Sequence, residues 1–188
     1  MGPIQRMDAR LFLLLNGVPH TPLTNKAFYG LSTLMNAGGG WVLFLLGAAL
    51  FDGRRGHRAL HGVLLPLWLA TMAVEFPIKR YFRRRRPFLD VVQAVAVGRK
   101  PIGYSFPSGH SAAAFAGAWL LRQYYPKLWP LWYTIAALVG FSRIYLGVHY
   151  PGDVMSGALT GTAIAELARW SIAQSNKQMI SADEAITM

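Results

Sequence analysis

Two basic residues follow a long apolar segment near the middle of the chain. Lys79 and Arg86 are seven residues apart, and Pro87 comes directly after them. Seven residues make about two helical turns, so the two cations share a face about 10 Å apart if the helix continues that far. Pro87 indicates where the helix ends. Such a pair can bind one anion, or it can simply contact the phosphates of surrounding lipids, and both readings stay open at this point.

A second group lies where a loop leads into the next apolar segment. Pro107-Ser108-Gly109-His110 combines a helix-capping residue with a glycine and an imidazole. Free backbone N–H groups at a helix start bind anions, and Gly109 permits close approach of the backbone. His110 can supply a proton. Taken alone, the same four residues are also typical of an ordinary Ser N-cap beside an incidental histidine.

The third group is Ser142-Arg143, then His149, then Asp153. His149 and Asp153 are four residues apart, so the carboxylate can hold one imidazole nitrogen and leave the other free. An imidazole held in this way is suited to nucleophilic or general-base chemistry. Arg143 adds a planar group that matches phosphate oxygens. A helix-end salt bridge is the alternative, but charged residues at membrane depth are usually functional.

Apolar segments must position these groups. The chain has 188 residues, a length typical of one domain, and 53% of them are hydrophobic. A helix needs about 20 mostly apolar residues to cross a bilayer. We therefore predict an all-α membrane bundle with about five crossings, the third helix beginning near Ser108, within residues 27–51, 59–78, 101–121, 128–145 and 154–172.

Short connections predict that successive helices run antiparallel, so their ends alternate between the two membrane faces. All three groups then fall on the same face. The opposite face receives residues 52–58, residues 122–127 and the C-terminal tail. We expect His149 to lie near Arg143 and on the same side as His110, in a site that combines three cations, an anion cradle and two histidines.

The two ends of the chain are less apolar than the centre and are not predicted to cross the membrane. Residues 1–25 are too short and too interrupted to cross, and are predicted to form a helix in the interface. Residues 26–172 form the predicted membrane domain. Residues 173–188 are polar and are predicted to form a solvated, disordered tail.

The formal net charge of +11 does not choose between nucleic acid, acidic lipid and an anionic substrate. Nucleic acid is disfavoured because the basic residues alternate with apolar segments and no nucleic-acid motif appears. The absence of cysteine excludes thiolate chemistry. No obligate protein partner is evident, and the apolar segments make membrane lipids the expected surroundings.

The ordered pattern of the three groups resembles the signature of the type 2 phosphatidic acid phosphatase superfamily. It spans residues 79–153 and matches at every motif position. The resemblance implies that His149 attacks phosphorus to form a phosphohistidine, that Asp153 orients it, and that His110 protonates the leaving lipid oxygen. It assigns phosphate binding to Lys79, Arg86, Ser108, Gly109 and Arg143. It implies no metal and no other cofactor.

Arg83, Arg84 and Arg85 exceed the motif and are expected to contact a second phosphate or an acidic headgroup. Arg83 is best placed if the helix continues, because it then lies between Lys79 and Arg86. Glu75 precedes Lys79 by four residues and is expected to pair with it.

The predicted function is hydrolysis of a terminal lipid phosphate or diphosphate. Phosphatidylglycerophosphate and undecaprenyl diphosphate rank first among the substrates, ahead of phosphatidic acid and lipid A phosphates. A haloperoxidase of the same superfamily is disfavoured by the membrane spans. A non-catalytic lipid-binding or transport protein is the alternative. Resemblance to bacterial members predicts an inner-membrane protein with the site facing outward, although the basic loop at residues 54–58 is also typical of a cytoplasmic face.

Overall fold

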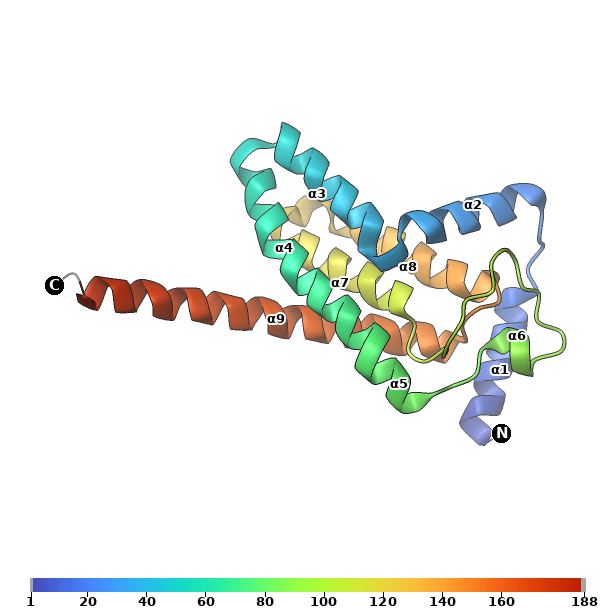
Figure 1. The fold of residues 1–188 in the computed structure, drawn as a ribbon. Helices are drawn as coiled ribbons and strands as arrows, with labels where there is room; N and C mark the ends of the chain where they lie inside the picture. The colour runs from blue at the N-terminus through green and yellow to red at the C-terminus, as the bar shows by residue number, and fades with distance from the viewer. Residues whose placement is uncertain (1, 187–188) are drawn as a thin grey trace.

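The computed structural model describes residues 2–186, and these residues form helices and connecting loops without an assigned strand (Figure 1). The predicted all-α class is confirmed. The helices are α1 (Pro3–Asn16), α2 (Pro22–Leu34), α3 (Gly39–Phe51), α4 (Gly53–Ala73), α5 (Lys79–Phe82), α6 (Pro87–Asp90), α7 (Gly109–Tyr124), α8 (Trp129–Tyr145) and α9 (Pro151–Ile186). Short 3₁₀ segments at Asn36–Gly38 and Pro126–Leu128 and a π-helical turn at Val74–Ile78 complete the described elements.

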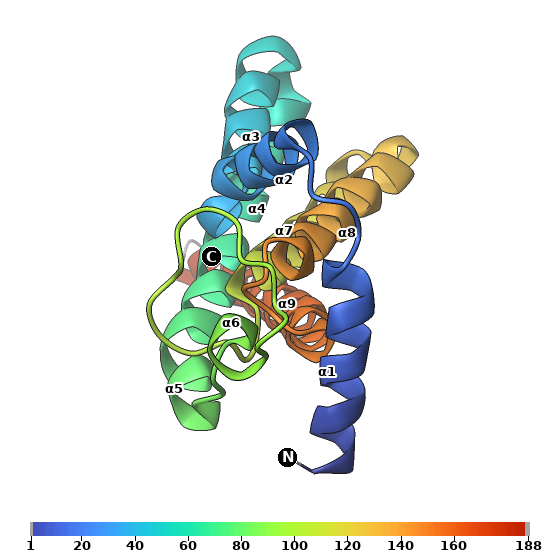
Figure 2. The same cartoon turned by 90° about the vertical axis from the view of Figure 1, so that its right-hand side faces the viewer.

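Helix α7 lies at the centre of the bundle and packs against α4, α8 and α9 (Figure 2). Its buried residues are mostly small, including a run of alanines at 112–114. Small side chains let helix backbones approach closely. On α9, a Cβ added to Gly157 would lie 2.3 Å from the carbonyl oxygen of Ser108, and one added to Gly161 would lie 2.4 Å from that of Ala112. Helices α7 and α9 are therefore joined by a glycine-lined contact.

The first apolar segment is broken, which corrects the prediction of one continuous helix over residues 27–51. Helices α2 and α3 meet at an angle of 50°. Ala37 has φ 50° and Gly38 has φ 80°, so neither can continue a right-handed helix. The polar Asn36 and the glycines that follow it mark the position of this break.

The second segment stays helical past its predicted end at residue 78 but does not reach Arg86. Pro77 has no N–H to donate and lies in the π-helical turn that connects α4 to α5. Helix α5 ends at Phe82 because Arg83 adopts a left-handed conformation, with φ 49°. Arg86 is extended, with ψ 153°. Lys79 and Arg86 therefore do not share a helical face, and the loop between them brings them into one site.

Within the described residues, one helical stretch is long and apolar enough to cross a membrane by length and composition, namely Gly53–Asp90. The bent pair Pro22–Leu34 and Asn36–Phe51 passes the same test when counted as one span. The prediction of about five crossings stays a prediction.

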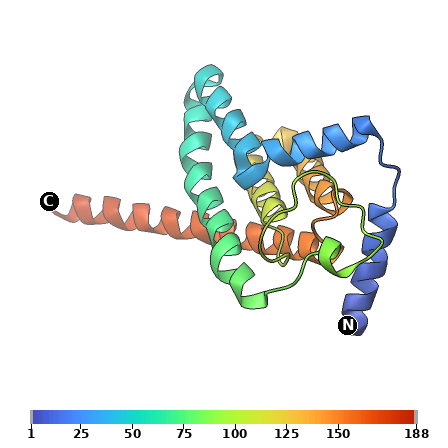
Figure 3. The same ribbon diagram turned by 45° about the vertical axis from the view of Figure 1, so that its right-hand side comes forward.

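Several distant segments meet at one end of the bundle. Helix α1, the long loop between α6 and α7, and the start of α9 lie together there (Figure 3). Helix α9 extends well beyond its neighbours in the opposite direction and continues to Ile186 (Figure 1). It thus includes most of the predicted polar tail at residues 173–188, of which residues 187–188 lie outside the described part of the chain.

Candidate active site

His149 lies in the short loop between α8 and α9 and is 2% exposed. The loop turns tightly because the backbone N–H groups of Val148 and His149 both donate to the carbonyl oxygen of Arg143, at 3.1 and 3.2 Å. Gly147 has φ 74°, and a Cβ at this position would lie 2.3 Å from the carbonyl oxygen of Val95. This glycine is therefore needed both for the turn and for close contact with the α6–α7 loop.

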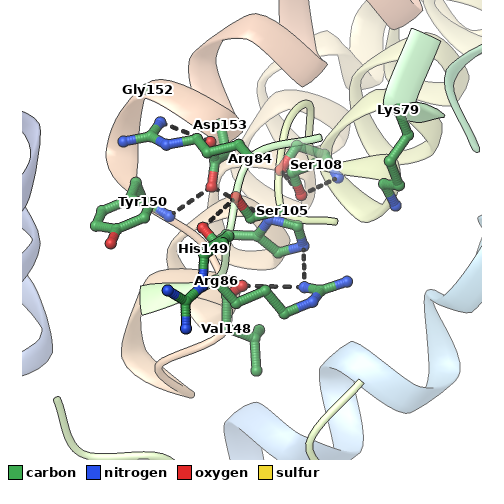
Figure 4. A network of polar contacts seen from close by, with 12 residues as sticks. Lys79, Arg84, Arg86, Ser105, Ser108, Val148, His149, Tyr150, Gly152 and Asp153 are labelled. Atoms are coloured by element: carbon green, nitrogen blue, oxygen red, sulfur yellow. Dashed lines mark hydrogen bonds and ion pairs between the residues drawn. The ribbon is translucent and has the colours of Figure 1, made fainter. Parts of the chain in front are cut away.

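The two nitrogens of the His149 ring have different surroundings (Figure 4). Nε2 lies 3.3 Å from Nη1 of Arg86. Nδ1 lies 3.6 Å from Oδ2 of Asp153, longer than a hydrogen bond, and is buried without a hydrogen-bond partner of normal geometry among the described residues. Since Arg86 can only donate, Nε2 accepts from it and the ring proton belongs on Nδ1, facing Asp153. The lone pair of the ring is thus on Nε2, where it accepts from the cation.

Asp153 is fully buried and fixed from several sides (Figure 4). Its Oδ2 accepts a hydrogen bond from the backbone N–H of Tyr150 at 2.9 Å, and its Oδ1 accepts one from Nη1 of Arg84 at 2.8 Å. Its carbonyl oxygen accepts from the backbone N–H of Ser108 at 2.9 Å. Asp153 therefore connects the start of α9 to the start of α7.

Arg86 and Arg143 are buried cations, 3% and 7% exposed. Arg86 donates to the carbonyl oxygens of Gly103 and Val148, at 3.1 and 3.0 Å. Arg143 donates to the hydroxyl of Ser32, and its Nε has no partner in the described part of the chain. Neither forms an ion pair with a carboxylate among the side chains that the structure describes. Buried charges are costly unless paired, so this arrangement favours a bound anion as the missing partner.

Lys79 is paired with Glu75, as the sequence predicts. Its Nζ donates to both carboxylate oxygens, at 2.8 and 2.7 Å. The carboxylate reaches the start of α7, where a Cβ on Gly109 would lie only 1.7 Å from Oε1 of Glu75. Gly109 therefore makes room for an acidic group at the helix start, and Lys79 lies beside it.

Ser108 caps α7, which begins where the sequence predicts. The Ser108 Oγ accepts from the backbone N–H of Ser111 at 3.4 Å and from the hydroxyl of Ser111 at 3.0 Å. His110 follows in the first turn and lines a cavity of about 190 Å³ with Glu75 and Gly109. The second histidine therefore opens toward a space beside α4.

Burial lowers the pKa of His149 well below its usual value of 6.5, and the positive charges of Arg86, Arg143 and Lys79 lower it further. The imidazole is therefore neutral near pH 7, the form in which it is a nucleophile. The same charges show that the first and third motif groups lie within electrostatic reach of one ring, and the hydrogen bond from Ser108 to Asp153 joins the second group to them. The structure thus brings His149 near Arg143, at the end of the bundle that also holds His110.

The three surplus arginines have different surroundings. Arg84 is bound between two carboxylates, with Nη2 2.8 Å from Asp8 and Nη1 2.8 Å from Asp153. The Arg85 side chain is 67% exposed and lies 3.3 Å from Asp90. Arg83 donates to the carbonyl oxygen of Arg80 at 3.1 Å. Its predicted position between Lys79 and Arg86 on one helical face is wrong, because α5 ends before it.

Two contributors to the site were missed from the sequence. Ser32 of α2 contacts Arg143, and Asp8 of α1 contacts Arg84. Asp8 had a detectable signal, since Asp8, Phe12 and Asn16 are spaced four apart on one helical face. Ser32 gave no comparable signal, because it lies in an apolar segment and precedes the break at Asn36–Gly38, which the sequence did not predict.

Comparison with known proteins identifies this arrangement. The model of the PAP2 superfamily matches residues 60–177, which include every motif group described above. The chain belongs to the PAP2 superfamily. The predicted family is therefore confirmed, and with it the prediction of an enzyme that hydrolyses phosphate esters.

Curated relatives in the PAP2 superfamily include named lipid phosphatases. The chain is 33% identical over 179 residues to a lipid A 4'-phosphatase of Porphyromonas gingivalis, covering 87% of this chain and 72% of the relative. It is 37% identical over 109 residues to an undecaprenyl-diphosphatase of Sulfolobus acidocaldarius, covering 57% of this chain and 53% of that protein. The chain thus spans about half of the second relative.

Two solved PAP2 structures are similar in fold. Aquifex aeolicus LpxE has a TM-score of 0.71 and 32% identity, covering 86% of this chain and 94% of that one. A transmembrane PAP2-type phosphatidylglycerolphosphate phosphatase from Bacillus subtilis has a TM-score of 0.70 and 26% identity, covering 93% and 88%. These relatives support the prediction that the chain is an integral membrane protein.

Proposed function

We propose that the chain hydrolyses the terminal phosphate of a membrane lipid through a phosphohistidine at His149. The observation that carries the proposal is the neutral, buried imidazole beside Arg86 and Arg143, two buried cations without a carboxylate partner among the described residues. A phosphoryl group bound there supplies the missing negative charge. Its phosphorus then lies beside Nε2, whose lone pair is released when Arg86 donates to the phosphoryl oxygens instead.

The reaction divides into two displacements. Nε2 of His149 forms a bond to phosphorus while the bond to the lipid oxygen breaks, and His110 donates a proton to that oxygen. Water then attacks the phosphohistidine and gives its proton back to His110, the P–N bond breaks, and inorganic phosphate leaves. Arg86 and Arg143 stabilise the charge on the phosphoryl oxygens in both steps, together with Lys79 and the N-terminus of α7 at Ser108 and Gly109. Asp153 faces the protonated Nδ1 and stabilises the positive charge on the ring. No metal takes part in this scheme.

A lateral groove supports a lipid as the leaving group. The cavity beside His110 shares Ala37, Thr71 and Met72 with a neighbouring cavity of about 260 Å³ lined mainly by apolar side chains of α3 and α4. A lipid chain in this groove would place its phosphate-bearing end at His110. The break between α2 and α3 forms one wall of the groove.

A larger cavity of about 470 Å³ lies beside Arg83 and Arg85, between α1 and the α5–α6 loop. Arg83 and Arg85 are available there for a headgroup with a second phosphate, whereas Arg84 is bound by two carboxylates. This cavity supports phosphatidylglycerophosphate or undecaprenyl diphosphate as substrate. Lipid A phosphates and phosphatidic acid are the competing substrates.

We place the protein in the bacterial inner membrane, with α1 in the interface, residues 26–172 as the membrane domain and the site facing outward. Cysteine introduced at Val91, near the site, tests this orientation, because the chain has no other cysteine. A membrane-impermeant thiol reagent should label it in intact cells. Labelling only after lysis would reverse the orientation.

Phosphate release from lipids in detergent tests the function. Wild type should release phosphate, most rapidly from phosphatidylglycerophosphate or undecaprenyl diphosphate in a comparison of four lipids that includes phosphatidic acid and lipid A. His149→Ala should release none above background and should accumulate no acid-labile ³²P. Lipid binding without release by wild type would instead favour the non-catalytic lipid-binding or transport protein.

A further inference from the structure

Helix α1 presents one buried polar face to the active-site end of the bundle. Asp8, Phe12 and Asn16 are 8%, 0% and 1% exposed, and successive members are one turn apart. An interfacial helix that contacts only lipid would bury apolar side chains in the membrane and expose its charged side chains to water. Here the buried stripe includes a carboxylate and an amide. The stripe therefore binds specific groups of the protein.

Asp8 makes two contacts at the start of α9. Its Oδ1 accepts a hydrogen bond from the backbone N–H of Gly152 at 2.8 Å, and its Oδ2 lies 2.8 Å from Nη2 of Arg84. Gly152 precedes Asp153 in the chain, and a Cβ on Gly152 would lie 2.7 Å from Oδ2 of Asp8. The carboxylate of α1 thus contacts the turn that carries the acidic group of the site.

Arg84 extends this contact to Asp153 itself. Its guanidinium binds Asp8 through Nη2 and Asp153 through Nη1, both at 2.8 Å, and lies 4.0 Å from the centre of the Tyr150 ring. The Arg84 side chain is 22% exposed and that of Asp153 is fully buried. A planar guanidinium can hold two carboxylates at fixed separation, which an ammonium group cannot do.

The rest of the stripe fixes α1 against the same loops. Asn16 donates through Nδ2 to the carbonyl oxygens of Ile144 and Tyr145, at 3.1 and 2.9 Å, and its Oδ1 accepts from the N–H of Val95 at 2.8 Å. Phe12 packs edge-on against Tyr150, with ring centres 5.6 Å apart. Asp8 is therefore held at its position by the turns that follow it.

We propose that Asp8 is a positioning residue for catalysis, acting through Arg84 on Asp153 and thereby on the His149 ring. The proposal rests on the proposed function, because it assumes that His149 is the nucleophile. With Asp8 present, Arg84 is fixed between two acids and Asp153 faces Nδ1. Without Asp8, Arg84 pairs only with Asp153, and the Asp153 carboxylate that faces the His149 ring is less constrained.

Asp8→Asn is the first test, since it keeps the size and the acceptor for Gly152 but removes the charge that binds Arg84. We expect kcat to fall about tenfold, because small displacements of reacting groups are costly, with KM changed less than about twofold. Asp8→Glu should recover part of the loss. A raised KM with unchanged kcat would overturn the proposal, as would full activity.

A double-mutant cycle separates positioning from general stability. If Asp8 acts through Asp153, Asp8→Asn should change the residual kcat of Asp153→Asn by less than about twofold. If Asp8→Asn lowered kcat by the same factor in wild type and in Asp153→Asn, the proposal would be overturned. Phe12→Ala is the comparison variant for stability: it should lower the melting temperature more than Asp8→Asn does and should give the same factor in both backgrounds.

Asp52→Asn is the matched chemical control. Asp52 accepts a hydrogen bond from Tyr125 at 2.9 Å at the other end of the bundle, so its neutralisation should leave kcat unchanged. Failure of the proposed function gives a different result. In that case wild type itself releases no phosphate, or His149→Ala is as active as wild type, whereas failure of the present proposal leaves both of those controls as expected.

Discussion

Both ends of the bundle carry arginines, but the surroundings of Arg86 and Arg143 at one end differ from those of Arg55 and Arg169 at the other. At the end that holds His149, Arg86 and Arg143 are almost fully buried and bind only neutral oxygens and the His149 ring. At the other end, Arg169 binds both oxygens of Glu166, at 2.8 and 2.6 Å. Arg55 donates to the carbonyl oxygen of Tyr124 at 2.7 Å and lies over the Tyr125 ring.

This difference teaches how to distinguish a ligand site from a structural cluster when both are basic. A cation that is exposed to solvent, as Arg55 is, or paired with a carboxylate, as Arg169 is, needs nothing further. A buried cation without an acidic partner is costly in the empty protein and becomes favourable when an anion binds. Net charge alone does not separate the two ends.

The largest expected effect is on catalysis. Arg143→Met should reduce phosphate release roughly a thousandfold, because it removes a donor to the phosphoryl oxygens. The same change should raise the melting temperature in detergent, because a buried charge without an acidic partner is replaced by an apolar group of similar length. Loss of both activity and stability would contradict the view that Arg143 is uncompensated in the empty site.

Arg55→Met is the matched change at the other end. It should lower the melting temperature and keep activity within about twofold of wild type, since the lost contacts are to a carbonyl oxygen and an aromatic ring. A large loss of activity would show that the two ends are not functionally separate.

Anion binding should stabilise only a protein with an intact catalytic end. Orthovanadate or phosphate at about a hundred times its Kd should stabilise wild type by about 2.7 kcal/mol. Thermal unfolding in detergent measures the shift. The shift should disappear in Arg143→Met and persist in Arg55→Met, and equal shifts in both variants would place the bound anion elsewhere.

The pH profile sharpens the comparison further. The lowered pKa of His149 predicts that kcat/KM keeps its value as pH falls to 6.5 and declines only below it, when the ring becomes protonated. Arg86→Gln removes a positive charge, which favours the protonated ring, so the residual activity should begin to decline at a higher pH than in wild type. A shift toward lower pH would contradict the proposed contact between Arg86 and the nucleophile.

The smallest effect is expected at the Glu166–Arg169 pair. The Arg169 side chain is 38% exposed, so solvent screens the interaction. Glu166→Gln should cost only about 0.5 kcal/mol of stability and leave activity unchanged. Chemical unfolding beside wild type measures this difference, and a loss several times larger would show that charge pairing at this end matters more than its exposure indicates.

The motif residues and the helices that carry them could be predicted because the signals are local. Apolar length predicts the segments, Ser108 predicts the start of α7, and the spacing of Glu75 and Lys79 predicts their ion pair. The alternation of helix ends predicts that the three groups lie at the same end of the bundle. These features need no knowledge of packing.

What could not be predicted depends on contacts between distant segments. Four consecutive arginines do not reveal that Arg83 turns into a left-handed conformation and ends α5. Nor does the sequence show that Arg84 lies between the carboxylates of Asp8 and Asp153, because these residues are 76 and 69 positions away along the chain. Their roles depend on where α1 folds back.

The glycine-lined contact between α7 and α9 has a mechanical consequence. The proposed nucleophile precedes α9, and the proposed proton donor lies in the first turn of α7. Backbone oxygens leave no room for larger groups at Gly157 and Gly161. The imidazoles of His149 and His110 are therefore held by two helices that are packed closely together. We therefore expect that substrate and product exchange through movement of the surrounding loops, such as the segment from Arg83 to Phe106, and not through movement of α7 relative to α9.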